Sequence, residues 1–435
     1  MRSRRWYLAI AAPVGAVALL AGSVPAAEAN PATSARYAAG ASATVYTGRA
    51  FDTCAAPPVS TITAWQASPY RALGIYIGGI DRHCSQPALT GPWVTAVSAR
   101  GWRLIPIYKG LQAPCGTAAH KISATAAAAQ GTAAAADADA SARALGLLSG
   151  SAIYNDMEAY PTGNASCRAA VLAFLSGWTT ELHRRGYVAG VYAQLYTGAA
   201  DLAGVYGSAA YARPDALWIA RYDLNPGLTG WTGIPAADWT GHQRAKQYRG
   251  GHDEAYGGVS LNIDNDQFDA PVATVGYTYT ATGTSALNAR SGPGTGNPIV
   301  GTVATGSALS LGCQAPGTKV GTSSLWDKLT NGWYVSDFYV STPSKTGYSA
   351  PLPRCTYPFQ VTPAGGLTVR AGLSVSSPAR GHLAAGALAW ISCQRTGKRV
   401  GTTLVWDKLT NGNWVSDYYL STLNKRTFSR PLPRC

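Results

Sequence analysis

The chain has 435 residues, of which 46% are hydrophobic and 13% are charged, and its net charge is +14. This length can bury more than one core, which excludes a single small domain and predicts about two to four domains. The charge is uneven, because the residues beyond Gly276 hold 15 Lys and Arg against four Asp, a net of +11. The tail is therefore expected to meet an acidic partner.

Residues 1–29 have the pattern of a signal peptide. Three arginines among the first five residues precede an apolar run at about 8–21, and Ala27-Glu28-Ala29 offers a small-x-small cleavage site. The arginines also suit a twin-arginine signal, and general secretory export stays an alternative. No other stretch approaches about 20 apolar residues, so no transmembrane segment is expected in the mature chain. We expect a secreted, extracellular or cell-wall-associated protein.

Eight cysteines in an exported chain predict disulfides rather than metal ligands. The sequence has no C-x-x-C, and its six histidines show no H-E-x-x-H spacing. We therefore expect neither a metal nor a cofactor.

Between about residues 45 and 275, short β-rich runs alternate with helix-length segments. The expected strands are 48–53, 72–78, 103–108, 152–158, 188–194, 216–222, 245–248 and 260–266. Helices are expected at 123–148 and 171–185. Eight strands alternating with helices predict an α/β fold, a (β/α)8 TIM-type barrel, with a doubly wound open sheet as the alternative.

The run Ile153 to Tyr160 contains two carboxylates, Asp156 and Glu158, spaced i and i+2. Residues two apart on a strand point to the same face, so the two acids project together. Two close carboxylates do not both ionise easily, and a raised pKa on one of them suits acid/base hydrolysis of a glycosidic bond. The alternative is that D-x-E merely ends an edge strand in water.

In a barrel of this kind the carboxyl ends of the strands build the site. Asp52 ends the first expected strand, and Asp264 and Asp266 end the eighth, so the acids should converge on one mouth. Aromatic rings stack on sugars and polar side chains bond hydroxyls, although buried aromatic residues are also ordinary core. The candidate substrate-binding residues are Tyr76, Tyr108, Tyr192, Trp218, Gln247 and Asp266.

At this point a family resemblance becomes specific. The runs GRAFDTC, SPYRALGIYIGG, GWRLIPIYKGLQAPC, IYNDMEAY, GYVAGVY and NIDNDQFD resemble the glycoside hydrolase-like domain of unknown function of secreted bacterial cell-wall proteins. That domain is similar to the family 25 glycoside hydrolases, the Chalaropsis-type lysozymes. The resemblance covers nearly all of 45–275 and implies a barrel whose acid pair is Asp156 and Glu158. It implies that Asp52 is the first-strand aspartate and that Asp264 is the acidic position on the last strand.

The same strand layout orders four cysteines. Cys54 and Cys84 follow the first and second strands, and Cys115 and Cys167 follow the third and fourth. Neighbouring strands bring each pair of loops together, so Cys54–Cys84 and Cys115–Cys167 are favoured among the three connectivities.

The tail is an internal repeat. Residues 287–355 and 367–435 align without a gap at a spacing of 80, and both contain W-D-K-L-T-N-G. The units, taken as 285–355 and 365–435, predict small all-β barrels. Each should hold one disulfide, Cys313–Cys355 and Cys393–Cys435. LNARSGPGTG and LTVRAGLSVS resemble the opening of bacterial SH3-like domains, which implies binding to cell wall.

Two functions from different classes follow. The first is a glycoside hydrolase acting on cell-wall polysaccharide, with Glu158 as general acid and Asp156 as its charged partner or as a group that positions the nucleophile. Asp52 and Asp264 would orient sugar or water. The second is a noncatalytic carbohydrate-binding protein that uses the same acidic mouth. No helix-turn-helix or zinc-finger spacing accompanies the basic charge, so no specific nucleic acid partner is expected. We expect a monomer.

Overall fold

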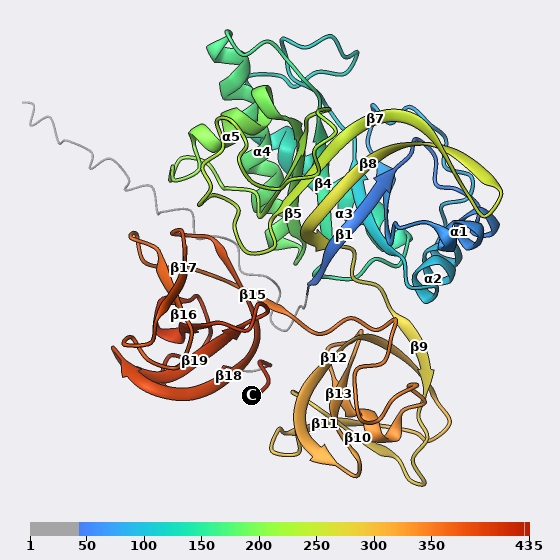
Figure 1. The fold of residues 1–435 in the computed structure, drawn as a ribbon, viewed down its shortest axis with the longest axis vertical. Helices are drawn as coiled ribbons and strands as arrows, with labels where there is room; N and C mark the ends of the chain where they lie inside the picture. Colours follow the sequence, from blue (N-terminus) through green and yellow to red (C-terminus); the bar gives the residue numbers. More distant parts are fainter. Residues whose placement is uncertain (1–42, 430) are drawn as a thin grey trace, which may run out of the picture.

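The computed structural model describes residues 43–429 and 431–435. The predicted signal peptide, residues 1–29, lies outside the described residues. The described chain forms one barrel and two separate β-units, drawn in Figure 1 from blue through yellow for the barrel and in orange and red for the units.

Eight strands close the barrel in sequence order. The strands are β1 (Thr44–Asp52), β2 (Ala72–Gly78), β3 (Arg103–Tyr108), β4 (Ala152–Met157), β5 (Val188–Gln194), β6 (Ala216–Ala220), β7 (Arg244–Tyr256) and β8 (Val259–Val272). All eight fall where strands were predicted, because their β-branched and aromatic residues favour the extended chain. The sheet is closed, so the doubly wound alternative is wrong.

The last strand departs from the predicted (β/α)8 pattern. β1 to β7 are parallel neighbours, whereas β8 runs antiparallel to both β7 and β1. Gly257 and Gly258 join β7 to β8 with φ values of 58° and 80°, and Tyr256 pairs with Val259. A two-residue Gly-Gly loop makes a hairpin, which reverses the chain and leaves no room for a crossover helix.

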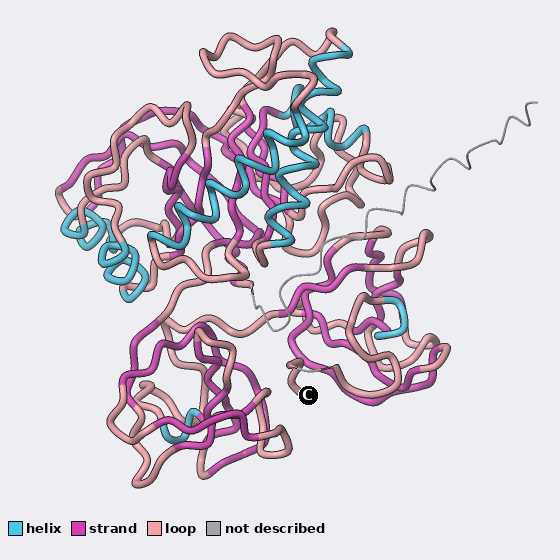
Figure 2. Tube along the Cα trace, turned by 180° about the vertical axis from the view of Figure 1, so that it is seen from behind, coloured by secondary structure: helices cyan, strands magenta, loops and turns pink. Residues whose placement is uncertain are grey.

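Helices lie outside the strands, as Figure 2 shows in cyan. They are α1 (Val59–Ala64), α2 (Gly91–Ala99), α3 (Ala127–Ala144), α4 (Ala165–Arg184) and α5 (Ala200–Gly204). α3 and α4 pack closely because Gly131 faces the α4 backbone, where a Cβ would lie 1.9 Å from the Phe174 oxygen. Within the described residues, no helix combines the length and the apolar character needed to cross a membrane.

The two tail units are curled antiparallel sheets of six strands each. The first contains β9 (Tyr277–Thr280), β10 (Leu287–Arg290), β11 (Ile299–Val303), β12 (Ala308–Val320), β13 (Ser323–Leu329) and β14 (Tyr334–Ser336). The second contains β15 (Tyr357–Gln360), β16 (Leu367–Arg370), β17 (Ala379–Leu383), β18 (Leu388–Val400), β19 (Thr403–Leu409) and β20 (Trp414–Ser416). β9 pairs with β12 and β15 with β18, so each sheet begins before the predicted starts at 285 and 365.

The W-D-K-L-T-N-G motif is part of a buried network in each unit. Gln314 Nε2 donates to Asp327 Oδ1 at 2.9 Å and to Asp337 Oδ1 at 3.0 Å, and Gln394 repeats this with Asp407 and Asp417. The four predicted disulfides are present, including Cys313–Cys355 and Cys393–Cys435. The repeat therefore keeps its aspartates for folding rather than for surface chemistry.

Both units sit at the end of the barrel where the parallel strands begin. Arg103, the first residue of β3, donates to the Tyr277 hydroxyl at 2.7 Å and to the Pro351 oxygen at 3.0 Å. Leu388 and Trp390 of the second unit belong to the same buried cluster as Val272 at the end of β8. Figure 1 shows the units below the barrel, so the opposite mouth stays uncovered by them.

Candidate functional site

The predicted acid pair lies at the carboxyl end of β4. Asp156 is the penultimate residue of the strand and is buried at 2% exposure, whereas the Glu158 side chain, just past the strand, is 53% exposed. The two acids therefore lie at different depths. Glu158 can reach a ligand in the mouth, and Asp156 lies beneath the surface.

Lys109 joins the two acids. Its Nζ lies 3.2 Å from Asp156 Oδ2 and also forms an ion pair with Glu158 Oε1. Lys109 directly follows Tyr108, the last residue of β3, and the parallel pairing of β3 with β4 places the two strand ends together. Our reading of the sequence missed this residue, although a lone lysine after a barrel strand, at the same level as the acids, was a usable signal.

The charges of Lys109, Asp156 and Glu158 affect one another. Burial raises the pKa of Asp156 to about 7, and repulsion from Glu158 acts in the same direction while Lys109 opposes it. Burial alone would lower the pKa of Lys109, but the charges of Asp156 and Glu158 raise it above its ordinary value. The pair thus contains a carboxyl group that exchanges its proton near neutral pH.

Gln112 holds the backbone of the acid pair. Its Nε2 donates to the Asp156 carbonyl oxygen at 2.7 Å, and its Oε1 accepts from the Glu158 amide at 2.9 Å. Three residues later, Cys115 is bonded to Cys167, which attaches this loop to the start of α4. The position of Glu158 is thereby set by a buried side chain and a covalent link.

A second group of acids faces the first across the mouth. Asp52 ends β1 and pairs in register with Asp264 of β8, and Gln247 of β7 pairs with Asp266. Asp264 therefore does not end its strand as predicted, because β8 runs the other way, but the register still brings it to the mouth. Gln247 Nε2 donates to Asp52 Oδ2 at 2.6 Å and lies 3.5 Å from Asp264 Oδ2.

Burial dominates the titration of this group. It raises the pKa of Asp52 to about 8, with repulsion from Asp264 as the next cause. Burial likewise raises the pKa of Asp266, with the charge of Asp52 as the next cause, and it raises the pKa of Asp264, which the charge of His252 partly offsets. Near neutral pH the group retains protons and can both donate and accept hydrogen bonds.

Two tyrosines extend the group toward solvent. The hydroxyls of Tyr192 and Tyr222 donate to Gln247 Oε1 at 2.7 and 2.8 Å. Tyr222 is 62% exposed and forms part of the rim, and Tyr76 packs against the barrel interior. Together with Gln247, these aromatic side chains surround the acids as predicted for Tyr76 and Tyr192.

Of the predicted substrate-binding residues, Tyr108 lies outside the barrel, and Trp218 and Asp266 are buried beneath the mouth. Tyr108 points out of the barrel, where its hydroxyl donates to Asp137 of α3 at 2.8 Å and its ring lies near Trp178. Trp218 is buried beneath the mouth and its Nε1 donates to the equally buried Asp266 at 3.0 Å. The alternation along a strand explains the error for Tyr108, because its inward neighbour is Ile107.

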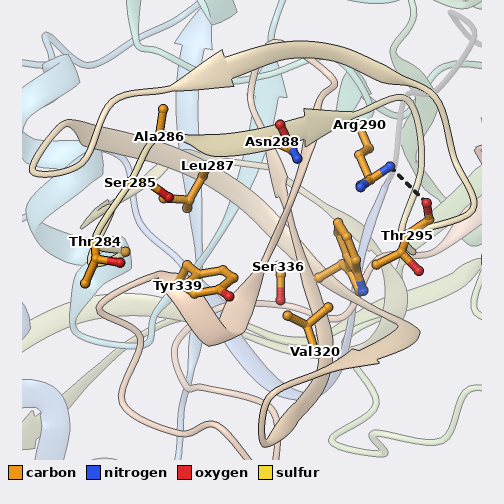
Figure 3. Close-up of a pocket in the computed structure, with 12 residues that line it drawn as sticks. Thr284, Ser285, Ala286, Leu287, Asn288, Arg290, Thr295, Val320, Ser336 and Tyr339 are labelled. Carbon is orange, nitrogen blue, oxygen red and sulfur yellow. Dashed lines mark hydrogen bonds between the residues drawn. The ribbon is translucent and has the colours of Figure 1, made fainter.

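Outside the mouth, the first tail unit contains a pocket of about 250 Å³. Figure 3 shows Arg290 and Thr295 toward one end of it and Tyr339 toward the other, and the Arg290 guanidinium donates to the Thr295 oxygen at 2.9 Å. The buried hydroxyl of Ser336 lines it without a hydrogen-bond partner in the described chain. Within the described residues, no group of three or more His, Cys, Asp or Glu is arranged to hold a metal.

Comparison with known proteins identifies the class of the barrel. Residues 63–268 match the family model described as "Rv2525c-like, glycoside hydrolase-like domain". The acid pair, Lys109, Gln247 and Asp264 lie inside the matched residues, and Asp52 lies before them. The chain thus carries a glycoside hydrolase-like domain.

Among curated proteins, the uncharacterized protein YraJ of Bacillus subtilis is 39% identical over 90 residues, which span 18% of this chain and 76% of YraJ. The chain belongs to the family of this protein. Among solved structures, the Tat-secreted protein Rv2525c of Mycobacterium tuberculosis is 16% identical with a TM-score of 0.37, covering 51% of this chain and 96% of that one. A muramidase from Acremonium alcalophilum is 18% identical with a TM-score of 0.31, covering 51% and 92%.

Proposed function

We propose that the protein is an exported glycoside hydrolase that cleaves cell-wall glycan, peptidoglycan or a related polysaccharide, by carboxylate acid/base chemistry. The observation that carries the proposal is the pairing of the buried Asp156, whose pKa is raised to about 7, with the exposed Glu158 at one mouth. The glycoside hydrolase-like family of residues 63–268 supports the same chemistry.

In this proposal the Asp156–Glu158 pair supplies the proton for the leaving oxygen, and Glu158 is the member that reaches the glycan. Lys109 contacts both acids, so its charge can stabilise Asp156 as a carboxylate once the proton has left the pair. Asp52, Asp264 and Gln247 bind sugar hydroxyls or water on the opposite side of the mouth. Glycan rings then stack between the tyrosines of the rim.

The repeats and the location belong to the same proposal. Two tail units of SH3-like type would hold the wall, and their attachment at the far end of the barrel leaves the mouth free for the glycan. Four disulfides fit an oxidising compartment outside the cytoplasm. The predicted signal peptide would deliver the chain there as a monomer.

The test is Glu158→Gln on the full chain with purified peptidoglycan. The substitution keeps the shape of the side chain but removes the transferable proton, so release of reducing ends should fall roughly 10²- to 10⁴-fold while glycan affinity stays near wild type. Asp253→Asn is the matched control, because Asp253 is an exposed acid of β7 paired with Asn262. Its turnover should equal that of the wild type.

The noncatalytic alternative has one observation in its favour. Lys109 contacts Glu158 directly, and an acid that is already held by a neighbouring cation is positioned for binding sugar hydroxyls. A wild-type protein that releases no reducing ends between pH 4 and pH 9, yet loses glycan affinity in Asp156→Asn, would establish the binding protein and refute the hydrolase.

A further inference from the structure

The two tail units share a fold but differ in charge. Residues 277–356 hold five Lys and Arg against two Asp, and residues 357–435 hold ten against two, so the net charges are +3 and +8. The same sheet order forms in both units. The additional positive charge of the second unit is therefore not required by the fold.

Part of the additional positive charge lies near the end of β18, in the hairpin that β18 forms with β19. Arg395, Lys398 and Arg399 are exposed there, whereas the first unit has Ala315, Thr318 and Lys319 at the matching positions. We call these three cations of the second unit the basic hairpin. Arg434 lies beside it, because the Gln394 amide donates to the Pro433 oxygen at 2.7 Å and Arg434 pairs with Gln394.

The backbone of the basic hairpin is rigidly placed. The Lys398 amide donates to the Leu373 oxygen at 2.8 Å, and the Trp406 indole donates to the Lys398 oxygen at 2.8 Å. In the first unit Trp326 makes the same bond to Thr318 at 2.9 Å. Because the tryptophan bond to this backbone forms equally well with threonine, the Lys398 side chain is not required for it.

No acid neutralises these side chains inside the unit. In the described part of residues 357–435, no Lys or Arg forms an ion pair with a carboxylate within 4.0 Å, and both aspartates are buried in the network with Gln394. Adjacent uncompensated cations repel one another and lower stability. Such a cost is offset when an anion binds.

We propose that the basic hairpin binds a linear polymer that carries phosphate groups. Arginine forks bind phosphate oxygens in pairs, and neighbouring cations can contact successive phosphates along one chain. The partner is distinct from the glycan of the barrel mouth, so binding does not require hydrolysis. The second unit attaches the protein to this polymer, and the first unit, which has Ala315 and Thr318 in place of Arg395 and Lys398, binds it more weakly.

The experiment measures binding of fluorescent inorganic polyphosphate to the full exported chain across a range of salt concentrations. Arg395→Ala and Lys398→Thr restore the residues of the first unit, so the fold should tolerate them. Together they should weaken binding roughly 30-fold at low salt, at about five-fold for each cation. The slope of log affinity against log salt should become shallower by about one to two, because fewer counterions are released.

Arg380→Val is the matched control. It also restores the residue of the first unit, Val300, but Arg380 is an exposed cation of the edge strand β17, which three strands separate from β18 in the sheet order. Its affinity should stay within about two-fold of wild type. Equal losses in Arg380→Val and Lys398→Thr would overturn the proposal in favour of general charge attraction.

Two competing polymers decide the chemistry of the partner. Poly-L-glutamate of equal charge should bind more weakly than polyphosphate, and single-stranded DNA should bind no more tightly. Equal affinity for poly-L-glutamate would overturn the assignment to a phosphate-bearing polymer. A clear preference for DNA would overturn recognition through phosphate groups alone, because DNA adds bases and sugars to the same phosphates. An inactive Glu158→Gln protein that binds polyphosphate normally would separate this result from the test of hydrolysis.

Discussion

At the scale of single residues, Lys109 determines how the acid pair can work. It is a nearly buried cation in contact with both carboxylates, and it lowers the pKa of Asp156 against the effects of burial and Glu158. Without Lys109, no cation would offset the repulsion between the Asp156 and Glu158 carboxylates. The proton would then stay on Asp156 to higher pH.

Lys109→Met should therefore raise the pKa of Asp156 above its value of about 7, by about 1 to 3 units. Carbon-13 NMR of the Asp156 carboxyl group measures this directly and needs no turnover. If the protein hydrolyses glycan, the alkaline limb of its pH profile should move upward by the same amount. Lys246→Met is the control, since Lys246 is also buried but pairs with Asp223 at 2.6 Å. An unchanged Asp156 titration in Lys109→Met would contradict this account.

At the scale of elements, the repeated W-D-K-L-T-N-G run stabilises each tail sheet through an acid that stays protonated. Asp327 on β13 is fully buried, and burial followed by repulsion from Asp337 raises its pKa to about 8. The folded chain binds this proton more tightly than the unfolded chain does. The resulting stability is complete below about pH 4 and is lost as the pH rises through about 8.

The wild-type free energy of unfolding should consequently be lower at pH 8 than at pH 5. Asp327→Asn keeps an oxygen for Gln314 Nε2 and removes the titration, so the difference between the two pH values should shrink by on the order of 1 to 4 kcal/mol. Urea unfolding at both pH values checks this. The exposed Asp253→Asn should leave the difference unchanged. A pH dependence that is identical in Asp327→Asn and wild type would show that Asp327 is not the titrating group.

At the scale of the whole molecule, the second unit is docked onto the barrel. Trp390 is 2% exposed and shares a buried cluster with residues at the end of the barrel where the parallel strands begin. The matching residue of the first unit is the exposed Ser310. Arg213, just before β6, also donates to the Ala385 oxygen at 3.1 Å. At this position of the repeat, the second copy has an apolar residue that contacts the barrel and the first copy has a serine.

Trp390→Ser restores the residue of the first unit and should destabilise the full chain by about 3 to 5 kcal/mol, because it opens a cavity at this contact. Limited proteolysis should cut the link between the barrel and the tail faster, and the urea midpoint should fall. Leu423→Ser, at a residue 57% exposed in the same unit, should change neither. A Trp390→Ser protein as stable as the wild type would show that the docking contact contributes little.

The sequence by itself determined the features that depend on local pattern. Alternation of β-branched and aromatic residues located all eight barrel strands, the 80-residue period located the repeated units, and the order of strands and cysteines predicted the disulfides. The pair Asp156 and Glu158 could be found because two-residue spacing sets a common direction on a strand. Each of these follows from the order and spacing of residues along the chain.

Only the tertiary structure decided how distant segments meet. The reversal of β8 follows from the local Gly257-Gly258 loop, but the register of β8 with β1, which places Asp264 opposite Asp52, does not. Lys109 reached the acid pair, and Trp390 reached the end of the barrel where the parallel strands begin, through strand pairing and packing between elements. Pairing partners and register depend on which surfaces are buried together, and no local sequence pattern specifies that.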